Sequence, residues 1–230
     1  MVNYFMEFLI DIFSSTVGQF TNPKKRVFIF YLFLSLLIAF AWLILKKKKT
    51  FVGSIKYIFD RKIFFSKSAK SDYKVFFINQ VIMLLISPHL LTQITIATAL
   101  YFFFFNIDLF EIGHLSYMPQ YLIVSLFTFF HFIVDDFSKY IVHRWMHRWP
   151  FLWALHKVHH SATNLTPMTV FRTHPLEGLV FTLRSAVAQG FVISTFVYLF
   201  GSGVDLYTVL GANLFIFLFN VFGSNLRHSH

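Results

Sequence analysis

Long apolar runs separated by short polar segments make up most of the chain. The run from Val27 to Leu45 contains no charged residue, and basic residues flank it on both sides. A bilayer core of about 30 Å needs roughly 20 helical residues, so this run predicts a membrane-spanning helix. Residues 1–20 are also apolar but include Glu7 and Asp11. We expect them to form an interfacial helix, with a further span as the alternative.

Further apolar segments follow at wider intervals. The stretch from Val75 to Phe105 is too long for one straight span, and Ser87-Pro88-His89 is expected to break it because proline removes a backbone donor. Gln120 to Val142 predicts another span, which continues into polar sequence. Leu179–Phe200 and Leu206–Phe222 predict a last pair of spans joined by a glycine-rich turn. The pattern therefore predicts an all-α fold, a multi-pass membrane bundle of about four or five helices.

Composition supports the membrane environment. Hydrophobic residues make up 57% of the 230 residues and charged residues 13%, and the mean hydropathy is +0.63. A soluble domain is typically about a quarter charged, so this chain departs from that class. It has no cysteine, which excludes disulfides and thiolate metal sites.

The basic residues are unevenly placed and predict the topology. Ten of the 20 Lys and Arg residues lie between Lys46 and Lys74, and none occurs from Val75 to Ser138. Because cytoplasmic loops carry an excess of Lys and Arg, residues 46–74 are predicted to be a cytoplasmic loop. Counting spans from there brings residues 143–178 and the last residues of the chain to the same side. Basic blocks between apolar runs indicate topology, and we expect no nucleic-acid partner.

Eight of the 11 histidines lie in four clusters, and two clusters have ligand spacing. His143 and His147 are four residues apart, so both imidazoles share one helical face. His156, His159 and His160 have the spacing i, i+3, i+4 and also share a face. Imidazole is a common ligand for transition metals, and two such boxes directly after a membrane span predict a metal site in which all five rings converge.

The other histidines have simpler interpretations. His89, His114 and His131 are expected to be interfacial or core residues, each with one hydrogen-bond partner. His174 precedes Pro175 and Glu177, a pattern that predicts the start of a helix with Thr173 or His174 as its cap. His174 could also point toward the metal site.

Two polar residues share the helical face of His143. Asp136 lies seven residues before it and Tyr140 three. Asp136 is predicted either to accept a hydrogen bond from a ligand histidine or to form a salt bridge with a nearby basic residue. Asp135 points elsewhere on the helix, and only the salt bridge is expected there.

In their order and spacing, these residues resemble the fatty acid hydroxylase and sterol desaturase superfamily. The similar segments are Asp136-Phe137-x-x-Tyr140-x-x-His143-Arg144-x-x-His147, His156-x-x-His159-His160, Phe171-Arg172-x-His174-Pro175-x-Glu177 and Asn225-Leu226-Arg227-His228. The bacterial sterol desaturase-like and alkylglycerol monooxygenase-like members look most similar. The resemblance covers residues 120–230, which implies a hydroxylase-like domain there and a membrane-anchoring region at residues 1–119.

The resemblance implies an enzyme that uses O2 to hydroxylate or desaturate a lipid, such as a sterol, a fatty acyl chain or an ether lipid. It implies two non-haem iron ions, with electrons from NAD(P)H relayed by a cytochrome b5-like or ferredoxin-like donor. The implied ligands are His143, His147, His156, His159, His160 and His228, with Asp136, Tyr140, His174 and His230 as candidates for supporting contacts. The histidine segments would form a cytoplasmic cap on the bundle. The membrane would be the inner membrane of a bacterium or the endoplasmic reticulum of a eukaryote.

One departure from the family pattern bears on activity. Family members carry a further His-x-x-His-His box after the segment of His228, whereas this chain stops at His230. We therefore expect an incomplete ligand set, because the chain is either a fragment or truncated reading frame or a degenerate, inactive member of the family. We also expect Arg227 to His230 to lie beside the two boxes. The alternative function is a non-enzymatic membrane metal-binding protein or a metal transporter, which would place ligands in the middle of its spans. A haem-binding bundle would need single opposed histidines.

Overall fold

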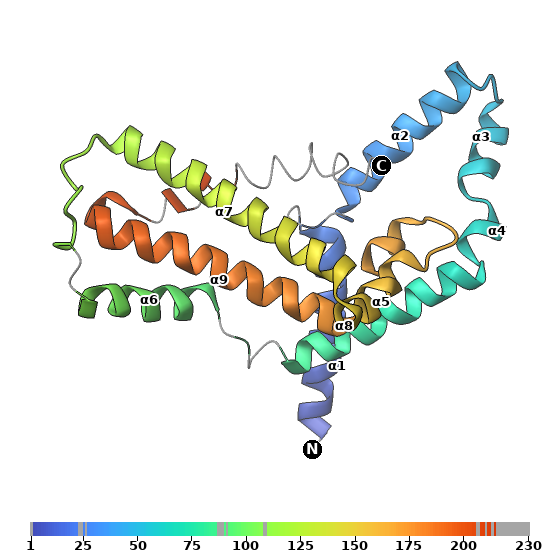
Figure 1. Ribbon diagram of the computed structural model, residues 1–230. Helices are drawn as coiled ribbons and strands as arrows, with labels where there is room; N and C mark the ends of the chain where they lie inside the picture. Colours follow the sequence, from blue (N-terminus) through green and yellow to red (C-terminus); the bar gives the residue numbers. More distant parts are fainter. Residues whose placement is uncertain are drawn as a thin grey trace. The chain divides into compact units, whose positions relative to one another are not determined.

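The computed structural model describes residues 2–22, 25, 27–86, 90, 92–107, 110–205, 208–209, 211–212 and 214. Every regular element in these residues is a helix (Figure 1), so the predicted all-α class is confirmed for this part of the chain. The chain forms two compact units. Unit 1 comprises Met1–Pro88 and Trp153–Glu177, and unit 2 comprises His89–Leu152 and Gly178–His230. Two of the three divisions fall inside helices, α8 (Pro150–His160) and α9 (Pro175–Phe200).

Unit 1 is built around α5. Its elements are α1 (Val2–Thr21), α2 (Ile29–Leu45), α3 (Phe51–Ile58), α4 (Arg61–Phe64), α5 (Lys67–Ile86), most of α8 and the short 3-10 helix η2 (Pro167–Phe171). Helix α1 packs on α5, and Ser15 Oγ donates a hydrogen bond of 2.7 Å to Gln80 Oε1. Helix α5 also packs against η2, which places η2 beside the polar first half of α5.

A buried ion pair fastens η2 to α5. Arg172 Nε lies 2.9 Å from Asp72 Oδ1, and both side chains are almost completely buried. Thr169 Oγ1 donates to Asp72 Oδ2 at 2.7 Å, and Arg172 Nη1 donates to Ser68 Oγ at 3.0 Å. Asn79 Nδ2 donates to the carbonyl oxygen of Thr173 at 2.9 Å. These bonds fix the backbone that leads into α9, because buried charges are stable only when they are paired and hydrogen-bonded.

Unit 2 contains α6 (Gln93–Ile107), α7 (Gln120–Arg148), most of α9 and the 3-10 turn η3 (Gly201–Gly203). Figure 1 shows α7 and α9 side by side, with α6 along α9. Phe127 of α7 meets Phe196 of α9 edge to face. Arg184, earlier in α9, donates to Asp135, later in α7, at 2.9 Å. The two helices are therefore antiparallel. Their shared apolar core consists of Ile123, Phe127, Val192, Phe196, Phe200 and Ala212.

Small side chains let α6 approach α9. Ala186, Gly190 and Ser194 are buried and lie four residues apart on α9. A Cβ atom at Gly190 would lie 2.9 Å from Ile96 Cγ2 and 3.0 Å from the carbonyl oxygen of Gln93. The spacing of small residues is that of closely packed membrane helices, whose backbones come together where side chains are minimal.

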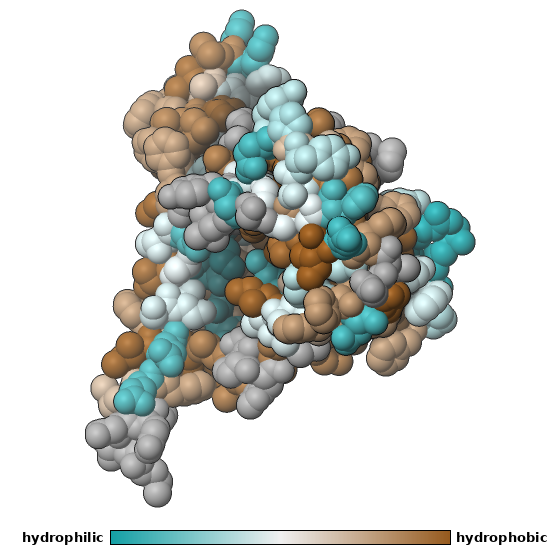
Figure 2. Space-filling model, turned by 90° about the vertical axis from the view of Figure 1, so that its left-hand side faces the viewer, coloured by the Kyte–Doolittle hydropathy of each residue, from teal (hydrophilic) through white to brown (hydrophobic). Residues whose placement is uncertain are grey.

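Among the described residues, two helices are long and apolar enough to cross a membrane, α7 and α9. Only 22% of the apolar window of α7 and 33% of that of α9 are buried, unlike the core helix of a soluble protein. Large apolar side chains such as Phe129, Phe137 and Val187 are exposed on them. On the face drawn in Figure 2, apolar side chains also reach the surface at many places. These exposed apolar surfaces fit a hydrocarbon environment.

The predicted helices are found with shifted ends. The run at residues 27–45 forms α2, and the stretch from residue 75 to 105 is divided into α5 and α6, as predicted. Residues 46–74, expected as a loop, instead contain α3, α4 and the start of α5, where Thr50 and Asp60 cap the first two of these helices. The predicted break at residues 87–89 and most of the predicted span at 206–222 lie outside the described residues. The division into regions 1–119 and 120–230 stays a prediction.

Candidate metal centre

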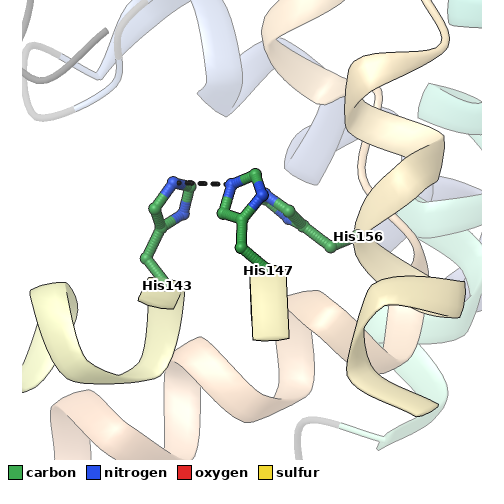
Figure 3. A group of neighbouring side chains, drawn as sticks. All are labelled: His143, His147 and His156. Atoms are coloured by element: carbon green, nitrogen blue, oxygen red, sulfur yellow. Dashed lines mark hydrogen bonds between the residues drawn. The ribbon is translucent and has the colours of Figure 1, made fainter. Parts of the chain in front are cut away.

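The first histidine box lies in the last two turns of α7. His143 and His147 point from one face of the helix, and their Nε2 atoms are 3.2 Å apart. Figure 3 draws both rings and the hydrogen bond between them, together with His156 of α8; each of the three offers one ring nitrogen as a ligand atom. His143 is half-buried and His147 is exposed. The predicted i, i+4 pairing is thus present on α7.

The second box belongs to α8, in unit 1. His156 and His160 place their Nε2 atoms 3.1 Å apart. The His159 ring stacks on that of His156, with ring centroids 5.6 Å apart. His156 is buried, with 2% of its surface exposed, whereas His160 is exposed. Helix α8 therefore repeats the pairing of α7 but holds one of its two imidazoles inside the unit.

The spacing of each pair fits one metal ion. Two imidazole nitrogens bound at about 2.1 Å lie about 3.0 Å apart at a right angle and about 3.4 Å apart at a tetrahedral angle. The observed separations of 3.2 Å in α7 and 3.1 Å in α8 fall between these values. Imidazole is a ligand for iron, copper, nickel and zinc. Each pair can accept an ion by exchanging its nitrogen–nitrogen hydrogen bond for two coordinate bonds.

Glu177 is a contact that the sequence interpretation missed. Its Oε1 atom lies 2.8 Å from Nδ1 of His156, and both side chains are buried. The sequence places Glu177 at the predicted start of a helix and in a segment similar to the family, but it predicts no contact with a histidine. The usable signal was a carboxylate in the first turn of a helix that follows two histidine boxes.

The start of α9 confirms the predicted cap. Pro175 is the first residue of the helix and Glu177 lies in its first turn. His174 Nδ1 accepts a hydrogen bond of 3.2 Å from the backbone N–H of Leu176. His174 therefore satisfies one of the N–H groups that an α-helix leaves unpaired at its start. A role of His174 toward a metal stays a prediction.

The two adjacent aspartates of α7 differ in environment. Asp135 is buried, with Arg184 Nη1 at 2.9 Å and Lys139 as a second partner, so the salt bridge expected there is confirmed. Asp136 is half-buried, and its contact with a ligand histidine stays a prediction. Tyr140, the other residue on that face, is exposed and accepts a hydrogen bond of 3.0 Å from Arg144 Nη1.

His131 corrects one expectation. It was expected to have one hydrogen-bond partner, but it is buried, with 1% of its surface exposed. Neither ring nitrogen has a partner among the described residues. Its ring packs edge to face on Phe127 instead, with centroids 5.5 Å apart. His114 is exposed, and its ring stacks against Phe110.

Several residues with a predicted role lie outside the residues that the structure describes. His89, His228 and His230 are not among the described residues, so the predicted ligand role of His228 and the placement of residues 227–230 beside the boxes are untested. The two described boxes belong mainly to different units. Convergence of all five imidazoles on one cavity stays a prediction.

Comparison with known proteins agrees with the resemblance. Residues 128–229 match the fatty acid hydroxylase family. The chain is 42% identical over 60 residues to the Delta(7)-sterol 5(6)-desaturase ERG3 of Saccharomyces cerevisiae, covering 26% of this chain and 16% of that protein. It is 36% identical over 64 residues to the Delta(7)-sterol 5(6)-desaturase of Eremothecium gossypii, covering 27% of this chain and 18% of that protein.

These alignments cover less than a fifth of either relative's length. No solved structure matches the chain. The region with the family match contains both described histidine boxes and the whole of α9. Over residues 128–229 the chain is therefore similar to the fatty acid hydroxylase family.

Proposed function

We propose that this chain is part of a membrane-bound oxidoreductase that uses O2 to hydroxylate or desaturate a lipid at two non-haem iron ions. The observation that carries the proposal is the pair of Nε2 separations, 3.2 Å in α7 and 3.1 Å in α8. Each pair supplies two cis ligands for one ion. The family match and the sterol desaturase relatives favour iron and a lipid substrate.

The choice of iron follows from the reaction. An unactivated C–H bond is broken by a redox-active metal that activates O2, and zinc has no redox chemistry. When bound, the two irons would supply that oxidising chemistry. The protein's own residues would hold the irons, orient the lipid and exclude water.

Helix length supports a site at the membrane surface. Helix α7 has 29 residues, about 44 Å at 1.5 Å per residue, whereas the hydrocarbon core is about 30 Å thick. The last turns, which carry His143 and His147, can therefore extend beyond the hydrocarbon. Trp145 and Trp149 stack there, with centroids 5.3 Å apart, and tryptophan is enriched at membrane–water interfaces. A metal at this level is within reach of a lipid in the bilayer.

The same placement argues against a transporter. Transporter sites are built near the bilayer midplane along a pathway, whereas the α7 box lies at the end of its helix. We further propose a multi-pass topology with the boxes on the cytoplasmic side, where a cytochrome b5-like or ferredoxin-like donor can deliver electrons. Reporters fused after Gln120 and after His160 should then report opposite sides; the same side for both would contradict this topology.

The proposal is tested by metal content and lipid product together. The full chain is purified in lipid nanodiscs, loaded anaerobically with Fe²⁺, and its bound iron is measured. Membranes that contain the chain are then supplied with O2, NAD(P)H and an electron donor, and their sterols and fatty acids are compared by mass spectrometry. The proposed function predicts bound iron together with a new hydroxylated or unsaturated lipid; bound iron without a lipid product would instead support the incomplete ligand set expected from the sequence.

The matched variants are His147→Ala and His114→Ala. His147 belongs to a pair, whereas His114 is exposed and lies outside the boxes. His147→Ala should lose iron and product, and His114→Ala should keep both. Equal iron in the two variants, or a lipid profile that does not change when the boxes are removed, would contradict the proposed function.

A further inference from the structure

We propose that Glu177 is a positioning residue that fixes the tautomer of His156 and thereby prepares its Nε2 atom as a metal ligand. The inference rests on the proposed function for the identity of the ion. Its structural basis is a contact between two side chains of this chain, Glu177 Oε1 and His156 Nδ1, 2.8 Å apart.

The direction of the hydrogen bond follows from the carboxylate. An ionised carboxylate only accepts hydrogen bonds, so the Nδ1 atom of His156, 2.8 Å from Glu177 Oε1, must carry the proton. A neutral imidazole has one N–H, so its Nε2 atom then keeps a lone pair. That atom faces His160, whose Nε2 is 3.1 Å away. With this tautomer, His156 Nε2 is the acceptor and His160 Nε2 the donor of their hydrogen bond, and His156 Nε2 is the atom that an ion would bind.

Among the described residues, Glu177 makes no hydrogen bond that competes with its contact to His156. In a capping box, a glutamate in the first turn returns to the backbone N–H of the cap residue. Here Oε1 is directed to His156, and Oε2 is buried without a hydrogen-bond partner in the part of the chain that the structure describes. The cap is supplied by the imidazole of His174. The carboxylate therefore serves the histidine, not the helix start.

Two features stabilise this buried carboxylate. Glu177 lies in the first turn of α9, where the helix dipole favours negative charge. The backbone just before α9 is anchored to α5 through Arg172 and Asp72 and through Asn79 and Thr173. These contacts fix the position of the backbone from which the Glu177 side chain extends. The Glu177 carboxylate then holds the His156 ring from one side.

Such carboxylate–histidine–metal arrangements raise the basicity of the ligand and set its ring orientation. Loss of the outer residue typically costs about 10–100-fold in metal affinity. The α7 pair has its own ligands, so loss of Glu177 should weaken one of two ions and leave the other. A general loss of fold would weaken both, which distinguishes positioning from a structural role.

The first measurement needs no metal. Nitrogen-15 NMR of the full chain in nanodiscs, labelled at histidine, reports which ring nitrogen of each histidine carries the proton; the His156 signal is assigned by its absence in His156→Asn. The expected result is a proton on Nδ1 in the unaltered chain and a mixture of tautomers in Glu177→Leu. Glu177→Gln, whose amide oxygen still accepts, should retain the Nδ1 proton. A proton on Nε2 in the unaltered chain would overturn the proposal, whether or not the protein binds iron.

The second measurement is anaerobic titration with Co²⁺ against a chromophoric chelator. The unaltered chain should bind two ions, and Glu177→Leu should bind one of them about 10–100-fold more weakly, with Glu177→Gln in between. Thr169→Val, which removes a bond to Asp72 in the same unit, controls for loosening and should lower thermal stability without changing the His156 tautomer. Unchanged affinity and tautomer in Glu177→Leu would overturn the proposal. An unaltered chain that binds no ion contradicts the proposed function, and the NMR result then decides the tautomer alone.

Discussion

The two histidine pairs have nearly the same nitrogen–nitrogen separation but different support. On α7, His147 is exposed, and its Nε2 atom lies 3.2 Å from that of His143. On α8, His156 is buried and bonded to Glu177, whose backbone follows a segment anchored on α5. Helical spacing alone therefore produces the pair geometry. On α8, a buried carboxylate lies 2.8 Å from Nδ1 of His156 and, by our proposal, defines where the proton of that ring sits.

The largest expected effect on stability comes from breaking the buried ion pair between Arg172 and Asp72, which anchors the segment before Glu177. Arg172→Leu leaves Asp72 buried without its charge partner, and breaking such a pair typically costs about 3–5 kcal/mol. The free energy of unfolding, measured by denaturant titration in mixed micelles, should fall by this amount. Ion binding at the α8 pair should weaken with it. Lys157→Leu, at an exposed basic residue of α8, is the matched control and should change stability by less than about 0.5 kcal/mol.

The double variant Asp72→Leu/Arg172→Leu sharpens this result. With both charges gone, no unpaired charge is buried, and part of the lost stability should return. A double variant with a lower free energy of unfolding than Arg172→Leu would contradict this expectation. It would mean that the ion pair stabilises the fold by more than preventing a buried unpaired charge.

The next effect separates the two pairs directly. His156→Ala leaves the buried Glu177 carboxylate without its donor, which should cost about 1–3 kcal/mol of stability. His147→Ala removes an exposed ring and should change stability by less than about 0.5 kcal/mol. Both variants should lose one ion in a Co²⁺ titration. Equal stability of the two variants would contradict the proposed difference between the pairs, in which Glu177 stabilises His156 and His147 is exposed.

A smaller effect is expected at the start of α9. His174→Ala removes the acceptor for the Leu176 N–H, and loss of a helix cap typically costs about 1 kcal/mol. His174→Asn should recover most of this loss, because asparagine is a good cap. Thermal unfolding followed by circular dichroism measures both. A loss of iron in His174→Ala without loss of stability would instead assign His174 to the metal.

The smallest effect is expected on the α7 side. Tyr140→Phe removes an acceptor for Arg144 on an exposed face, and the change in unfolding free energy should be below about 0.5 kcal/mol. The same stability measurement checks it. A marked loss of Co²⁺ affinity in this variant would show that Tyr140 supports His143, as the resemblance implies.

The sequence predicted those features that depend on residues only a few positions apart. The pairing of His143 with His147 follows from 3.6 residues per turn, and Pro175 with His174 predicts the start of α9. Partners far apart in sequence were not predictable. The bond from Thr169 to Asp72 joins residues 97 positions apart. The bond from His156 to Glu177 joins residues 21 positions apart, and no local pattern encodes it.

The adjacent aspartates illustrate the same limit within one helix. Asp135 and Asp136 are about 100° apart around α7. From sequence, Asp136 was favoured for function because it shares a face with His143. The side of the helix that is buried depends on where α9 lies, and Arg184 of α9 bonds to Asp135. The neighbouring helix α9 therefore decides which of the two adjacent aspartates is buried. The sequence of α7 does not show where α9 lies.

Gly190 has a consequence for how this chain can vary among its relatives. In hydrocarbon, no avoidance of water drives α6 and α9 together, so their spacing depends on the fit of their surfaces. A methyl group at position 190 would meet Ile96 Cγ2 at 2.9 Å. The space between positions 190 and 96 therefore does not hold both a Cβ atom at 190 and an isoleucine side chain at 96. Relatives that carry alanine or serine at position 190 should therefore carry a smaller residue than isoleucine at position 96, as correlated substitutions between two helices.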